Sequence, residues 1–96
     1  MKIEDLFKVA EEKYQCSYNK DFKTIKIKFE YFTILIEETE KQELHVKMQR
    51  GSSGFEGFYS IKIMSEMFKN DKRKIVDFII FRSLEHYYTQ KCKSLL

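Results

Sequence analysis

The sequence has no tryptophan, no proline and only three glycines among its 96 residues. Because glycine and proline are the residues that most often form tight turns and end regular elements, their scarcity predicts a chain built mainly of helices and strands. No apolar run approaches the roughly 18 residues that a membrane-spanning helix needs. The amino-terminal segment mixes lysines and acids where a signal peptide would carry an apolar core. We therefore expect a cytoplasmic protein with no membrane span.

The residues that are present suit one folded domain. Hydrophobic residues make up 43% of the chain and aromatic residues 16%, which is ample for a packed interior, and 34% charged residues supply a solvated surface. Domains usually run to about 100–150 residues, so the chain suffices for one core and is too short for two. We predict a single domain over residues 1–96.

Groups that could perform chemistry are few. The sequence has no phosphate-binding loop of the GxxxxGK type, no GxSxG elbow and no HExxH helix. Only His45 and His86 could act as general bases near neutral pH, and the pattern places His45 on the solvent face of a strand. Cys16 and Cys92 lack a metal-ligand spacing, so we expect two buried or half-buried thiols. The sequence predicts a non-enzymatic protein without a metal or cofactor.

Hydropathy periodicity predicts an α+β fold. Apolar residues recur at helical spacing near both ends of the chain, and they alternate with polar residues in the middle, as in half-buried strands. In order, the expected elements are a helix at 2–13, strands at 14–18, 22–37 and 44–49, a loop at 50–57, and helices at 58–68 and 72–92. We predict one three-stranded antiparallel sheet packed by the amino-terminal helix and the two carboxy-terminal helices.

The apolar pattern changes parity within the segment 22–37. Ile25 and Ile27 share one face of an extended strand, but three later apolar residues have the opposite parity: Phe32, Ile34 and Ile36. Because side chains alternate strictly along a strand, the change requires a bulge or turn near residues 30–32, or else a sheet covered on both sides. We favour the bulge. Without a bulge, the three residues would form an exposed patch for self-association or for a foreign protein.

Two groups of residues are candidate protein contacts. Four acids fall within seven residues of an expected hairpin tip: Glu37, Glu38, Glu40 and Glu43. Three aromatic residues follow the glycines: Phe55, Phe58 and Tyr59. The acids could dock on a basic groove, and the aromatic residues could anchor an interface. The alternatives are an ordinary charged hairpin tip and aromatic residues that fill the core.

The last predicted helix makes the protein basic. Residues 72–96 contain six lysines and arginines against two acids, which gives +4, whereas the whole chain carries +3. Three cations crowd the first turn of this helix, where the helix dipole disfavours them. With two strand lysines they form a candidate nucleic-acid contact: Lys26, Lys28, Lys72, Arg73 and Lys74. The alternative is a solvated helix start, with Asp71 as its cap and Asp77 paired to Arg73 or Lys74.

The opening MKIEDL, the following hairpin strands and the paired terminal helices resemble the small anti-CRISPR inhibitors carried by phages of low-GC Gram-positive bacteria. The resemblance covers nearly the whole chain and concerns the order of elements. It implies a phage-encoded or mobile-element protein that binds a host nuclease and occupies its DNA-recognition cleft. In this chain the acids that match such a role are Glu37, Glu38, Glu40 and Glu43.

The central order of one helix, three strands and a helix is also similar to double-stranded-RNA-binding domains. The three cations open the last helix and not the helix that directly follows the sheet, where those domains carry their basic motif. The sequence therefore predicts a small interaction protein that binds and inhibits a host nuclease such as a CRISPR effector, with a nucleic-acid-binding module as the alternative.

Overall fold

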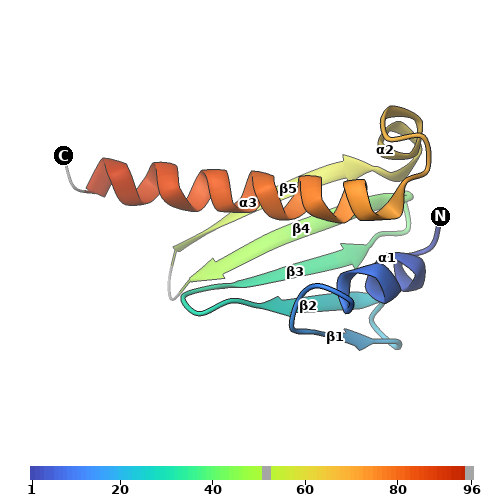
Figure 1. Cartoon of the computed structure of the whole chain (residues 1–96), viewed down its shortest axis with the longest axis horizontal. Helices are drawn as coiled ribbons and strands as arrows, with labels where there is room; N and C mark the ends of the chain where they lie inside the picture. The colour runs from blue at the N-terminus through green and yellow to red at the C-terminus, as the bar shows by residue number, and fades with distance from the viewer. Residues whose placement is uncertain (51–52, 95–96) are drawn as a thin grey trace.

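The computed structural model of the chain describes residues 1–50 and 53–94. It is an α+β domain in which five antiparallel strands follow one another across a sheet in chain order (Figure 1). The elements are α1 (Ile3–Ala10), β1 (Cys16–Asn19), β2 (Thr24–Lys28), β3 (Thr33–Glu38), β4 (Glu43–Arg50), β5 (Ser53–Ser60), α2 (Ile61–Met67) and α3 (Lys72–Ser94). The prediction of a three-stranded sheet is therefore wrong, although the α+β class and the helices at both ends are confirmed.

The first correction concerns the segment 22–37, which is a hairpin and not one strand. The chain reverses between Phe29 and Phe32, where the Phe29 amide donates a hydrogen bond to the Phe32 carbonyl at 3.0 Å. The reversal pairs β2 with β3 in a register that sets apolar residues of the two strands opposite each other. Of the expected alternatives, the turn is therefore the correct one, and the favoured bulge is wrong.

The same hairpin buries the residues of the expected self-association patch. Phe32 is 8% exposed and Ile34 and Ile36 are 0% exposed. They share the helix-covered face with Ile25 and Ile27. In an unbroken strand the two sets would point to opposite faces, but the turn places Ile34 opposite Ile27 and Ile36 opposite Ile25, and paired residues point to the same face. The hypothesis of an exposed apolar patch at Phe32, Ile34 and Ile36 is wrong.

The second correction concerns the expected loop at 50–57, most of which belongs to β5. β5 pairs with β4 from Ser53 to Ser60, while residues 51–52 lie outside the described part of the chain. Gly54 marks a close approach of two strands, because a Cβ atom there would collide with the carbonyl oxygen of Met48. The glycines that predicted a loop therefore permit strand pairing, and the helix expected from residue 58 begins at Ile61 after the Ser60 cap.

α1 and α3 lie side by side against one face of the sheet (Figure 1). α3 begins as expected at a cap, with the Lys74 amide donating to Asp71 Oδ1 at 3.2 Å. Its buried Ser83 is satisfied by a hydrogen bond to the Ile79 carbonyl at 3.0 Å. The core consists of apolar residues from all three helices, from the helix-covered side of β2, β3 and β4, and from the β2–β3 turn.

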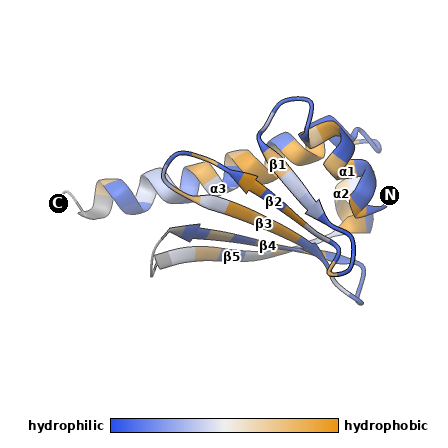
Figure 2. Ribbon diagram, turned by 90° about the horizontal axis from the view of Figure 1, so that it is seen from below, coloured by the Kyte–Doolittle hydropathy of each residue, from blue (hydrophilic) through white to orange (hydrophobic). Residues whose placement is uncertain are grey.

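The opposite side of the sheet is not covered by any helix of the described chain (Figure 2). We call it the open face, and the helix-covered side the helix face. Along β2, Lys26 and Lys28 point to the open face, while Ile25 and Ile27 are buried on the helix face. Across residues 1–50 and 53–94, no helix is both long and apolar enough to cross a membrane.

Candidate functional site

Acidic and aromatic residues from three parts of the chain meet at one end of the sheet. The β1–β2 turn, the β3–β4 turn and the end of β5 surround a broad hollow of about 690 Å³. Five acids line it, against the two lysines Lys23 and Lys41: Asp21, Glu37, Glu38, Glu40 and Glu43. Phe22 and Phe58 also line it, and they are 73% and 57% exposed. We call this surface the acidic hollow.

The two turns that form the acidic hollow are held by local hydrogen bonds. Asn19 Oδ1 accepts from the amides of Asp21 and Phe22 at 3.0 and 3.1 Å, which fixes the turn that carries the exposed Phe22 ring. In the β3–β4 turn, the Thr39 amide donates to the Glu43 carbonyl at 2.9 Å, and the Glu43 amide donates to the Thr39 hydroxyl at 3.3 Å. The hollow is therefore a preorganised surface.

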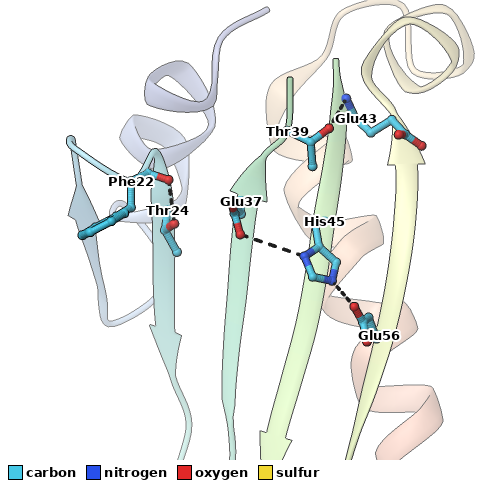
Figure 3. A network of polar contacts seen from close by, with 7 residues as sticks. All are labelled: Phe22, Thr24, Glu37, Thr39, Glu43, His45 and Glu56. Atoms are coloured by element: carbon cyan, nitrogen blue, oxygen red, sulfur yellow. Dashed lines mark hydrogen bonds and ion pairs between the residues drawn. The ribbon is translucent and has the colours of Figure 1, made fainter. Parts of the chain in front are cut away.

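His45 stands beside the acidic hollow with both ring nitrogens near carboxylates (Figure 3). Nε2 lies 2.5 Å from Glu56 Oε1, and Nδ1 lies 4.0 Å from Glu37 Oε2. The ring stacks on Phe58 with centroids 4.4 Å apart and planes 5° apart. The open-face position expected for His45 is confirmed, and the stacked His45 ring holds one face of the Phe58 ring.

The predicted protein contacts divide between the two faces of the sheet. The structure brings Phe58 together with the acids Glu37, Glu38, Glu40 and Glu43. Because side chains alternate along β5, Phe55 and Tyr59 lie on the helix face, where both are half-buried. Phe55 packs on His86 at 4.7 Å and Tyr59 on Phe78 at 5.9 Å, so these two aromatic residues join β5 to α3.

The predicted nucleic-acid contacts do not form one surface. Lys26 and Lys28 are on the open face, whereas Lys72, Arg73 and Lys74 begin α3, which packs on the other side of the sheet. Arg73 is also paired with Glu12 of the α1 end at 3.0 Å. The alternative pairing of Asp77 with Arg73 or Lys74 is replaced by contacts with α1-side residues.

Asp77 joins α3 to the segment after α1. Its Oδ1 accepts a hydrogen bond from the Tyr14 hydroxyl at 3.1 Å and lies 3.4 Å from Lys13 Nζ. Burial, and then the hydrogen bond to Asp77, raise the pKa of Tyr14 above its ordinary value of 10.0. The neighbouring Tyr14 and Asp77 charges raise the pKa of Lys13. The cluster fastens the helices together and lies apart from the acidic hollow.

Replacing Tyr14 by phenylalanine is expected to lower the free energy of unfolding at pH 7 by about 1 kcal/mol, the value of one hydrogen bond. Because the pKa of Tyr14 is higher in the folded state than in the unfolded state, Tyr14 contributes fully to the free energy of unfolding below pH 10. This contribution is lost as the pH rises through the folded-state pKa. Urea unfolding of wild type and Tyr14→Phe at pH 7 and pH 11 measures this. A difference that persists unchanged at pH 11 would contradict the burial of the hydroxyl.

The two thiols differ in their exposure to solvent. Cys16 is half-buried, and burial, followed by the charge of Glu11, raises the pKa of its thiol. Cys92 is exposed on α3, so the expectation that both thiols are at least half-buried is wrong for that residue. In the part of the chain that the structure describes, no three histidine, cysteine or acidic side chains are grouped as metal ligands.

Comparison of the chain with protein-family models, curated proteins and solved structures finds no match. The resemblance to anti-CRISPR inhibitors was drawn on a three-stranded order of elements, and the five-stranded sheet departs from it. Sequence reasoning also missed Phe22, which it placed inside an extended segment. The one available signal was an apolar residue between two charged ones, Asp21 and Lys23, directly after the expected turn.

Proposed function

We propose that the protein is a small non-enzymatic interaction protein whose acidic hollow binds a basic surface of a partner protein. The observation that carries the proposal is the convergence of five acids and two exposed phenylalanine rings on one preorganised hollow at one end of the sheet. Net negative charge steers a basic partner toward the hollow and provides specificity. The exposed rings provide affinity, because aromatic side chains at the centre of an interface supply much of its binding energy.

The partner that best suits this surface is a nuclease. Clefts that bind nucleic acid are lined with lysine and arginine to contact phosphates, so an acidic surface with aromatic anchors can occupy such a cleft and exclude the substrate. This is the mode of action that the resemblance to phage-encoded anti-CRISPR inhibitors implies. The proposal is thus inhibition of a host nuclease such as a CRISPR effector, by steric and electrostatic competition with DNA.

A cleavage assay with a purified, guide-loaded CRISPR effector nuclease tests the proposal. Adding the protein before the DNA is expected to suppress cleavage in proportion to the protein concentration, and a stable complex is expected in size-exclusion chromatography. Adding it after the DNA is expected to inhibit less, because the cleft is already occupied. Undiminished cleavage and no complex at micromolar protein would contradict the proposal for that nuclease class, and duplex binding by the protein alone would favour the nucleic-acid alternative.

A further inference from the structure

Among residues 1–50 and 53–94, β5 forms one edge of the sheet and has β4 as its one strand neighbour. An edge strand presents alternate backbone N–H and C=O groups that no neighbouring strand uses. Proteins commonly keep such edges short or place lysine or proline on them. The opposite edge, β1, is four residues long, but β5 is eight residues long and has Glu56 as its only charged residue. β5 is therefore a template on which a further strand can pair.

The Phe58 ring indicates which side chain the further strand would carry on the open face. His45 stands opposite Phe58 on β4, and the two rings are stacked at 4.4 Å. The other face of the Phe58 ring is thus turned toward the free edge of β5, and the residue is 57% exposed. A guanidinium group on the next strand can stack on this free ring face.

The charges around β5 favour a basic segment over a second copy of the chain. Glu56 lies on the same face as Phe58, two residues away, and Phe58 itself lines the acidic hollow. Antiparallel pairing of two β5 strands about Glu56 would place the two Glu56 carboxylates side by side, and juxtaposed like charges oppose association. A strand with lysine or arginine on the open face instead meets the negative charge of Glu56 and of the acidic hollow.

On the helix face, the surroundings of β5 favour apolar side chains on the added strand. Phe55 and Tyr59 are half-buried there beneath α3, against His86 and Phe78. Side chains of a strand added beside β5 would alternate between the two faces, so every second residue would stand next to these aromatic rings. An added strand of alternating basic and apolar residues suits both faces.

We propose that the free edge of β5 accepts an extended segment of the partner protein as a further strand, with alternating basic and apolar residues and an arginine stacked on Phe58. This inference rests on the proposed function, in which the partner presents a basic surface, and it names the form in which that surface binds. Main-chain hydrogen bonds then give affinity, and the alternating side chains give specificity.

Titration of the ¹⁵N-labelled protein with a synthetic ten-residue peptide of alternating arginine and valine tests the inference. The largest amide shifts are expected along β5, together with slower hydrogen exchange of its edge amides. A second peptide has the same side chains with a methyl group on every backbone nitrogen, so it has no N–H to donate to a ladder whichever way the added strand runs. Its affinity is expected to be at least about tenfold lower than that of the first peptide, because several main-chain hydrogen bonds are lost.

Two variants separate ring stacking from general effects on the fold. Phe58→Leu is expected to weaken binding of the arginine–valine peptide by about two- to fivefold, the value of one exposed cation–π contact. Tyr31→Leu changes another exposed aromatic residue, 64% exposed in the β2–β3 turn, and is expected to bind as wild type does. Equal weakening by both variants would overturn the assignment of Phe58.

The outcomes also distinguish this inference from the proposed function. Equal binding of the two peptides, with shifts confined to the acidic hollow, would overturn strand addition and leave the hollow as a surface for basic partners. Absence of shifts with either peptide would overturn strand addition, and the cleavage assay would then decide the proposed function independently.

Discussion

Replacing Ile36 by alanine is expected to lower the free energy of unfolding by about 2–5 kcal/mol, which is a large fraction of the stability of a small domain. Ile36 is 0% exposed and lies between Ile25 and Val46 on the helix face. Truncation removes its burial and leaves a cavity in a core that two helices and the sheet build together. Urea unfolding followed by circular dichroism measures the loss as a lower transition midpoint at an unchanged slope.

The matched control is the neighbouring residue on the same strand. Leu35 is only half-buried on the open face, opposite Lys26 and Lys47, and Leu35→Ala is expected to cost about 1 kcal/mol or less. Equal losses for the two variants would contradict the hairpin at 29–32, because an unbroken strand covered on both sides would bury both residues. A larger loss for Leu35 would reverse the assignment of the faces.

Reversing two charges of the acidic hollow is expected to weaken strongly the binding of the proposed partner, a nuclease. Glu40→Lys with Glu43→Lys changes the hollow from an excess of acids to an excess of lysines. Because juxtaposed like charges at an interface cost several kcal/mol, affinity is expected to fall by about 100-fold or more. Calorimetry or surface plasmon resonance with the guide-loaded nuclease measures the loss, and the thermal midpoint of the free variant shows whether the fold is intact.

Two exposed acids outside the hollow provide a matched control. Glu30 lies in the β2–β3 turn at the other end of the sheet, and Glu66 lies on α2. Glu30→Lys with Glu66→Lys makes the same change in net charge and is expected to reduce affinity by less than about fivefold through long-range electrostatics alone. If the two double variants lose affinity equally, net charge and not the acidic hollow governs binding.

The sequence predicted the elements whose local signals agree with their surroundings. The α3 cap at Asp71 and the open-face position of His45 follow from capping chemistry and strand alternation, and both are confirmed. The acids of the β3–β4 turn were identified because charge density is visible in sequence. The sequence did not predict that these acids form a hollow with Phe22. Phe22 lies in a turn 15 or more residues earlier in the chain, and the backbone hydrogen bond from Glu38 to Lys23 brings that turn beside the acids.

The errors arose where a local signal had two physical meanings. Glycines at 51–57 are typical of a loop, but Gly54 serves as a point of close strand approach in β5. The parity change at Phe32 is compatible with a bulge, a turn or a two-sided sheet, and the turn carries no glycine or proline that would identify it. Phe55, Phe58 and Tyr59 were grouped by their proximity in sequence, whereas alternation along β5 separates Phe58 from the other two.

Carboxylate footprinting of the complex tests most directly whether the acidic hollow is the binding surface. Carbodiimide labelling of the free protein and of the protein bound to the guide-loaded nuclease, followed by mass spectrometry, compares the reactivity of individual acids. The account predicts protection of Glu40 and Glu43 in the complex with unchanged labelling of Glu30 and Glu66. Unchanged labelling of Glu40 and Glu43 in a complex that protects α3 instead would contradict it.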